Sequence, residues 1–169
     1  MNAVSLRTIQ RRYRKIAAAL DSDSSLPTTP QHDGSPHAEH QADTYFYVVT
    51  ERGNEWERRT TNDPDELLSW FVRGLTGELA GTWELANRVP HRDSRRLRFQ
   101  RHVELLRGIR PEWAEAQHAD YEAVLAEHPF DDSSSDRVDY IVELRDRGVE
   151  NEEAIRLGYE RFPDPSPMY

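Results

Sequence analysis

The chain contains no cysteine, a single lysine and no long apolar run. Without cysteine it can form no disulfide, thiolate metal site or cysteine nucleophile. Its apolar segments fall far short of the ~20 residues that a transmembrane helix needs. The segment Ile16 to Leu20 is also too short to be the apolar core of a signal peptide. We therefore expect a soluble, cytoplasmic protein without a membrane partner.

Motifs of catalysis and cofactor binding are missing as well. The sequence has no glycine-rich phosphate loop, no Gly-x-Ser-x-Gly elbow and no His-Glu-x-x-His zinc pair. Two groups of potential metal ligands, within residues 37–40 and 128–132, lack a helix-spaced or thiolate partner. We predict no catalytic residue, no metal and no cofactor. An enzyme is therefore the class that the sequence supports least.

Charge is what the chain has in abundance. Of 169 residues, 31% are charged and 36% hydrophobic, which suits one domain with a linker or solvated helices. The formal net charge is −9. Residues 1–20 and 88–110 are net positive, whereas 21–87 and 111–169 are net negative. An acidic protein favours basic partners and repels nucleic-acid backbones.

The first twenty residues predict a basic amphipathic helix. Its apolar positions recur at helical spacing, with arginines between them: Leu6, Ile9, Tyr13, Ile16 and Leu20. Docking of this face on the core is its usual role, and membrane or nucleic-acid binding is the alternative. Residues 21–35 are rich in Ser, Thr, Pro and Asp and predict a linker.

Two strands are predicted on either side of Gly53. The apolar run Tyr45–Val49 predicts a central strand that is covered on both faces. The charged segment Glu55–Thr60 is typical of an exposed sheet edge, where charge discourages pairing with other chains. Pro36–Ala42 is a candidate third strand. The sequence thus predicts a small antiparallel sheet of two or three strands.

The connection between these strands predicts a tight turn. Gly53–Asn54 fits a two-residue type II′ loop, because glycine readily takes the first central position. This loop places Arg52 opposite Glu55. It also places Glu51 opposite Trp56. For Arg52 and Trp56, a structural role within the hairpin and contact with a partner both stay open.

A long helix is predicted from Asp63, as N-cap, to about Val89, with Pro64 at its first position. Its apolar residues cover one broad arc: Leu67, Phe71, Leu75, Leu79, Trp83, Leu85, Ala86 and Val89. Glycines at 74, 77 and 81 form a neighbouring stripe. Each costs about 1 kcal/mol relative to alanine in a helix. The stripe therefore predicts a second backbone crossing closely there, or a break in the helix near its first two glycines.

One carboxylate, Glu78, falls inside the apolar arc. A buried carboxylate must be paired or neutralised. Arg95, on the apolar side of the next predicted helix, is the candidate partner. The alternative is that Glu78 reaches water at the edge of its helix.

Three further helical segments complete the predicted fold. Ser94 to Gly108 is the first, and the second starts at Pro111 and ends before Pro129. After a break at residues 131–135, a helical hairpin with Gly148 as C-cap follows. The chain is therefore predicted to be a mostly helical α+β protein, with long helices packing on a small sheet.

The arginines of residues 88–110 do not gather on one helix face, as binding to a nucleic-acid backbone requires. With acidic segments on either side in sequence, internal ion pairing is the preferred interpretation. Glu84 and Arg88, four residues apart, are predicted to form a surface pair.

A set of short motifs resembles the bacterial Immunity protein 63 family. They are Pro36 to Glu39, Tyr45 to Glu55, Asp65 to Trp70, Glu84 with Arg88, Asp93 with Arg95, Arg96 and Phe99, and His128 to Asp132. Ser69 and Ala38 depart from the family pattern, where an aromatic and a larger aliphatic residue are expected. The resemblance implies a small, non-catalytic antidote that binds a polymorphic toxin encoded by a neighbouring gene.

This resemblance also organises the chain. We predict five segments: an N-terminal helix (1–20), a linker (21–35), an immunity-protein-like α+β domain (36–132), a C-terminal helical hairpin (133–162) and a tail (163–169). The predicted partner is a basic toxin domain. Carboxylates that could face it are Glu39, Glu51, Glu55, Glu57, Asp131 and Asp132.

Two other functions stay open. The first is a nucleic-acid-binding regulator that uses the basic segments 1–20 and 88–110. Its signature would be DNA or RNA affinity that falls steeply with salt. The second is a metal-dependent hydrolase, whose signature would be a metal retained on purification.

Overall fold

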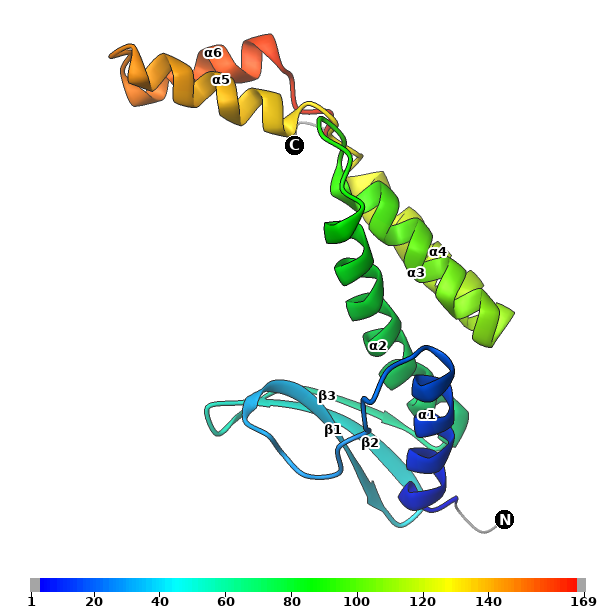
Figure 1. Cartoon of the computed structure of the whole chain (residues 1–169). Helices are drawn as coiled ribbons and strands as arrows, with labels where there is room; N and C mark the ends of the chain where they lie inside the picture. Colours follow the sequence, from blue (N-terminus) through cyan, green and yellow to red (C-terminus); the bar gives the residue numbers. More distant parts are fainter. Residues whose placement is uncertain (1–3, 167–169) are drawn as a thin grey trace. The chain divides into compact units, whose positions relative to one another are not determined.

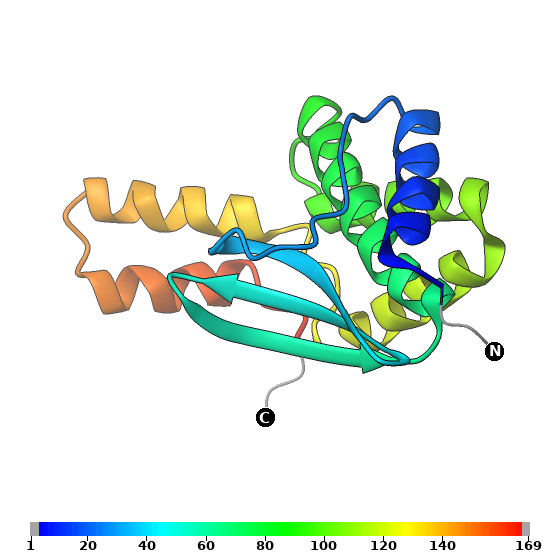
Figure 2. The same cartoon turned by 90° about the horizontal axis from the view of Figure 1, so that it is seen from below.

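The computed structural model describes residues 4–166 as six α-helices and one three-stranded antiparallel sheet (Figures 1 and 2). The elements are α1 (Leu6–Ala19), β1 (Asp33–Gln41), β2 (Thr44–Glu51), β3 (Asn54–Thr61), α2 (Pro64–Ala86), α3 (Ser94–Ile109), α4 (Pro111–Glu127), α5 (Ser134–Asp146) and α6 (Asn151–Arg161). The predicted mostly helical α+β class is confirmed. The chain divides into two compact units within α2: unit 1 ends at Glu78 and unit 2 begins at Leu79.

In unit 1 the apolar strand is central, as predicted. The strand order is β1-β2-β3, with β2 antiparallel to both neighbours. Tyr45 and Val48 point to opposite faces of the sheet, and both are almost completely buried. The candidate strand Pro36–Ala42 forms most of β1. Both faces of the middle strand are therefore covered.

The hairpin loop differs by one residue from the prediction. Its central residues are Arg52 and Gly53, with φ angles of 50° and 82°, and Glu51 pairs with Asn54. Two positive φ angles are the mark of a type I′ turn, so the predicted type II′ loop at Gly53–Asn54 is wrong. The prediction failed because it assigned the left-handed conformation to glycine alone, whereas Arg52 adopts it too.

This shift moves Trp56 out of the strand register. Val49 pairs with Glu57 and Thr50 with Glu55, which leaves Trp56 as the extra residue of a β-bulge. The predicted pairs Arg52–Glu55 and Glu51–Trp56 are therefore wrong. Trp56 is 71% exposed, an unusual position for so large an apolar side chain.

The core of unit 1 lies between the sheet and two helices. Ile9, Tyr13 and Ala17 of α1 are buried, which confirms that its apolar face docks on the core. The ring of Phe71 in α2 lies 6.5 Å from that of Tyr13 and 5.0 Å from that of Tyr47, centroid to centroid. These contacts join α1 to α2, and α2 to the central strand of the sheet.

The connector between α1 and β1 is held along much of its length. Gln10 Nε2 donates to the carbonyl of Leu26 at 2.9 Å, and the hydroxyl groups of Tyr13 and Ser24 lie 2.9 Å apart. The backbone N–H of Ala38 donates to the carbonyl of Pro27 at 2.8 Å. Leu26 is buried. Although its composition predicted a linker, this segment packs against the core of unit 1.

Helix α2 starts as predicted. The Asp63 carboxylate caps it by accepting from the N–H of Asp65 at 2.8 Å, and Pro64 is its first residue. The helix ends at Ala86, before the predicted Val89. Its apolar arc is buried only in the first half, where Leu67, Phe71 and Leu75 pack. Leu85 is 66% exposed, so the prediction that the whole arc is covered is wrong.

The glycine stripe of α2 does not mark a crossing backbone where it can be checked. A Cβ atom added at Gly74 would meet nothing within 4 Å. One added at Gly81 would meet only the side chain of Arg98, at 3.7 Å. Helix α2 is also continuous through both positions. At Gly74 and Gly81, the predicted close crossing of a second backbone and the alternative break in the helix are therefore both wrong.

In unit 2, α3 and α4 lie side by side, as do α5 and α6 (Figure 1). The rings of Phe99 and Tyr121 stack with centroids 3.7 Å apart, and Tyr121 Oη lies 2.6 Å from His102 Nδ1. In the C-terminal hairpin, Gly158 leaves the space that Ile141 fills. Gly148 has a φ of 84° just after α5, which confirms it as the predicted helix end.

Candidate partner-binding site

An arginine-centred network covers the face of the sheet that is turned away from α2. We call it the Arg58 network, and it comprises His37, Glu39, Glu55 and Arg58. Cross-strand pairing places His37, Val48 and Arg58 side by side on this face. Figure 2 shows the sheet in front of α2, with this face toward the viewer. Four polar side chains from β1 and β3 therefore cover the apolar residues of β2.

Arg58 holds the network together. It donates to Glu39 Oε2 at 3.0 Å and makes a two-pronged contact with Glu55, at 2.9 and 2.7 Å. Its guanidinium carbon also lies 5.1 Å from the centroid of the Phe46 ring. Glu39 Oε1 lies 3.1 Å from Nε2 of the fully buried His37. A single guanidinium thus bridges both edge strands over an aromatic ring.

These contacts keep the carboxylates ionised. Burial by itself would raise the pKa of Glu39, but hydrogen bonds from His37 and Arg58 hold this pKa below its ordinary value. The hydrogen bond from Arg58 likewise lowers the pKa of Glu55. Because each ionised carboxylate already has a cationic partner, neither offers an unpaired charge to a binding protein.

The other two carboxylates predicted on the hairpin are also near arginines. Glu57 forms an ion pair with Arg59. The guanidinium of Arg59 lies 5.2 Å from the centroid of Tyr47 and 5.9 Å from that of Trp70. Glu51 Oε1 lies 3.7 Å from Nε of the exposed Arg52 at the turn. Glu39 on β1 and the three carboxylates on the hairpin are therefore all at least partly neutralised within unit 1.

Asp132 lies in unit 2, where it joins two connections. Its carboxylate accepts both prongs of Arg96, each at 2.9 Å, and the backbone N–H of Asp93 at 2.8 Å. The hydrogen bond from Arg96 is the main reason that the pKa of Asp132 falls to about 2. This carboxylate therefore ties the connection before α3 to the one after α4.

Asp131 has a similar structural position. It forms an ion pair with the buried Arg137 and accepts from the N–H of Ser133 at 3.1 Å. Its own N–H donates to Asp93 Oδ2 at 2.9 Å. Arg137 also donates to the carbonyl of Phe162 at 2.6 Å. Sequence reasoning missed Arg137, although its place one turn into a predicted helix after two aspartates was an available signal.

Glu78 and Arg95 have separate surroundings. Arg95 donates to Asp93 Oδ2 at 2.6 Å and to the carbonyls of His128 and Pro129 at 3.0 and 2.8 Å. The partner predicted for it, Glu78, is exposed. Among residues 4–166, no hydrogen bond or ion pair involves Glu78. The Asp93 carboxylate therefore has the role that the sequence suggested for Glu78.

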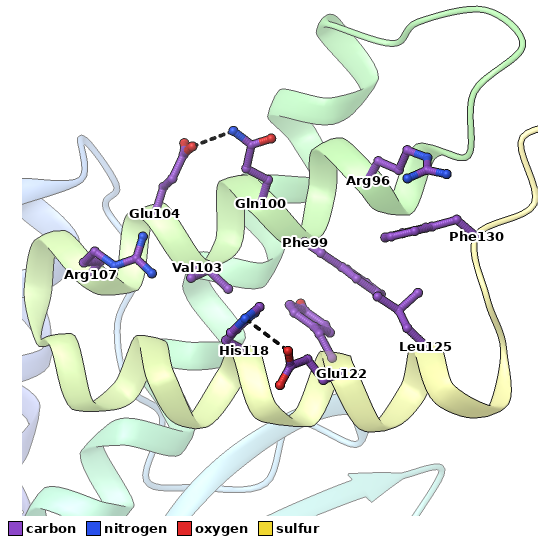
Figure 3. A pocket seen from close by; sticks show the side chains of 11 residues that line it. Arg96, Phe99, Gln100, Val103, Glu104, Arg107, His118, Glu122, Leu125 and Phe130 are labelled. Carbon is purple, nitrogen blue, oxygen red and sulfur yellow. Dashed lines mark hydrogen bonds and ion pairs between the residues drawn. The ribbon is translucent and has the colours of Figure 1, made fainter.

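A groove runs along the paired helices of unit 2 and has a volume of about 450 Å³ (Figure 3). Its floor is apolar, with Phe99, Val103 and Leu125 from α3 and α4 and Phe130 from the following connection. Gln100 and Glu104, 2.8 Å apart, lie along its rim. This groove was not predicted from the sequence.

The arginines of the basic segment 88–110 mostly face acidic partners. Three pairs join α3 to neighbouring segments, and one lies within the helix: Arg95–Asp93, Arg96–Asp132 and Arg107–Glu115, and Arg101–Glu104. Arg88 holds Glu84 with two hydrogen bonds, at 2.9 and 3.0 Å, and Glu84 is buried rather than at the surface as predicted. The preferred interpretation, internal ion pairing, is confirmed for these arginines.

Within residues 4–166, no group of three or more His, Asp or Glu side chains is arranged to hold a metal ion. In the same part of the chain, no helix has both the length and the apolar character needed to cross a membrane.

Comparison with known proteins gives one match. The model of the Immunity protein 63 family matches residues 42–123, from the turn before β2 into α4. Comparisons with curated proteins and with solved structures found no match. Over residues 42–123, the chain is similar to the Immunity protein 63 family, which confirms the resemblance predicted from its motifs.

Proposed function

We propose that this chain is an immunity protein that acts in the bacterial cytoplasm by binding and inactivating the toxin encoded beside it. The match to the Immunity protein 63 family over residues 42–123 carries this proposal. The matched segment includes β2, β3 and the bulged hairpin between them. Binding is stoichiometric and needs no chemistry from the chain, because covering the toxin's active site or an adjacent surface is enough.

The hairpin of unit 1 is the contact surface that we propose. Trp56 supports it, because a largely exposed tryptophan in a bulge is typical of an anchor residue in a protein interface. Arginines 58 and 59 and carboxylates 39, 51, 55 and 57 lie in the same sheet, and Arg52 lies in its hairpin turn. In contrast, we assign Asp131 and Asp132 to holding unit 2 together, because both accept backbone N–H groups as well as arginines.

Co-expression with the toxin gene that neighbours it tests the function. We expect cells that produce both proteins to survive and the two chains to co-purify as a complex of fixed stoichiometry. Undiminished killing, with the chain folded and soluble and no complex formed, would reject the proposal. A toxin variant that is catalytically inactive should still bind, since inhibition by coverage does not require a working toxin.

A further inference from the structure

Unit 1 contains a small pocket that neither the sequence motifs nor the hairpin surface explains. It lies between α1, the connector, the start of β1, β2 and α2, and its volume is about 200 Å³. We call it the Glu78 pocket, after the carboxylate that lines it. Sites for small-molecule ligands usually measure ~300–1,000 Å³. The Glu78 pocket therefore has room for one side chain rather than for a cofactor.

Aromatic rings form much of its wall. The pocket wall includes four of them, from Tyr13, Tyr47, Trp70 and Phe71. The rings of Tyr47 and Trp70 meet edge to face, with centroids 6.1 Å apart. Their electron-rich faces attract cations, and Arg59 lies within 6 Å of both centroids. These rings therefore already hold one guanidinium within the protein.

A negative charge accompanies the rings. Glu78 lines the pocket, is exposed, and has no hydrogen bond or ion pair among the described residues. Its charge nevertheless reaches the phenols on the wall. Burial is the main cause of the raised pKa of Tyr13 and of Tyr47, and the carboxylate of Glu78 raises both further. Glu39, Glu51, Glu55 and Glu57 each pair with an arginine, whereas Glu78 has no ion-pair partner among the described residues.

We propose that the Glu78 pocket receives one arginine side chain of the toxin, with its guanidinium against the aromatic wall and paired with the Glu78 carboxylate. This rests on the proposed function, and it names the group that the partner must present. Arginine is preferred to lysine because its planar head stacks on rings while it donates two parallel hydrogen bonds to a carboxylate. An anionic group is excluded, because the only unpaired charge lining the pocket is negative.

Two variants test the pocket in the complex. Glu78→Gln keeps the shape and removes the charge. Gly74→Leu fills the space, because a Cβ atom at this helical position meets nothing within 4 Å and Gly74 lines the pocket. We expect each variant to weaken toxin binding about tenfold or more, as loss of a desolvated charge pair does. Asp43→Asn, which removes the same charge in the β1–β2 turn outside the pocket, should change affinity by less than about twofold.

A second measurement does not need the toxin. N-acetylarginine amide is titrated into the ¹⁵N-labelled chain, with the neutral N-acetylcitrulline amide as the matched probe. We expect the arginine probe alone to shift the Trp70 indole and Gly74 amide signals, and Glu78→Gln to abolish the shifts. Circular dichroism establishes that each variant is folded.

The outcomes separate the two proposals. If the folded variants bind the toxin like the wild type and the arginine probe shifts no pocket signal, the pocket proposal is wrong while the immunity function stands. If the wild type does not bind the toxin, the proposed function fails, and the toxin arginine assigned to this pocket fails with it. Equal shifts from both probes would also overturn the pocket proposal, because charge would then have no part.

Discussion

Arg137 and Asp131 form a buried ion pair at the base of the C-terminal hairpin. Arg137 is only 5% exposed, and its second donor reaches the carbonyl of Phe162 at the end of α6. One guanidinium thus joins the connection after α4, the first turn of α5 and the end of α6. Its removal would leave Asp131 Oδ2 without its cationic partner and the Phe162 carbonyl without its donor.

Substitution of Arg137 should therefore be costly. We expect Arg137→Gln to lower the free energy of unfolding by about 3 kcal/mol, in line with other broken buried pairs. Urea unfolding followed by circular dichroism measures the change. Arg147→Gln is the control, because Arg147 pairs with Glu143 at the surface and should cost under about 0.5 kcal/mol. Equal effects of the two substitutions would contradict a structural role for the buried pair.

The stability of the fold should fall in acid. Arg96 lowers the pKa of Asp132 to about 2, and arginine hydrogen bonds also lower the pKa of Glu84 and, against burial, of Asp93. Lowered pKa values in the folded state mean that these groups stabilise it fully above their unfolded pKa of about 4. That stability is lost as the pH falls from about 5 toward 2. Urea midpoints should decrease across this window.

The share of Asp132 in this acid sensitivity can be measured separately. Asp132→Asn cannot titrate, so its urea midpoint should be lower than that of the wild type at neutral pH. It should approach the wild-type midpoint in acid, where the wild-type carboxylate becomes protonated. A constant gap between the two proteins at every pH would show that Asp132 does not contribute to the acid sensitivity.

Gly158 should not accept a side chain. A Cβ atom there would overlap Cγ1 and Cδ1 of Ile141, which packs in the core of the α5–α6 hairpin. We expect Gly158→Ala to destabilise the protein by about 1–3 kcal/mol, the usual cost of an overpacked core. In an Ile141→Ala background, where both clashing atoms are absent, the further loss caused by Gly158→Ala should be smaller. Gly108→Ala is the control, because its site in α3 is open and alanine favours a helix by up to about 1 kcal/mol.

Replacement of Arg52 should stabilise the hairpin turn. It lies in the left-handed region with a φ of 50°, beside Gly53 in a type I′ turn. Asparagine tolerates this conformation better than arginine, and Asn-Gly is the preferred type I′ sequence. We expect Arg52→Asn to raise the unfolding free energy by about 0.5 kcal/mol. Asn54→Gly tests the rejected loop position, and it should bring no gain if the turn is as described.

Trp56 should matter for binding and little for folding. Because its side chain is largely exposed, Trp56→Ala should change the unfolding free energy by under about 0.5 kcal/mol. As an interface anchor, it should weaken toxin binding by about 2 kcal/mol, near thirtyfold, in titration calorimetry. Val138→Ala, also exposed but in unit 2, provides the control. Unchanged affinity of the tryptophan variant would exclude Trp56 from the interface.

The elements could be predicted where a local rule sets their ends. Asp63 and Pro64 start α2, Pro111 starts α4, and Gly148 follows α5, and each position could be located from sequence alone. The apolar run of β2 likewise placed it at the centre of the sheet. These features depend on neighbouring residues, so a single sequence contains the information.

Features that depend on distant residues were not predicted. The turn lies one residue earlier in the chain than predicted, because Arg52 takes the left-handed conformation that glycine usually adopts. Asp93 receives Arg95, where the sequence analysis had suggested Glu78, because the connection after α4 also donates to Asp93. The Glu78 pocket gathers residues from five segments of unit 1, and helical or strand periodicity describes only one element at a time.

Because carboxylates of the sheet already pair with arginines, the sheet should discriminate among cationic proteins by more than their charge. An incoming guanidinium must displace Arg58 or Arg59, so one charged contact is exchanged for another of similar strength. A ribosomal or DNA-binding protein that offers only positive charge therefore gains little from the exchange. Discrimination among such proteins would then depend on the shape around Trp56 rather than on net charge.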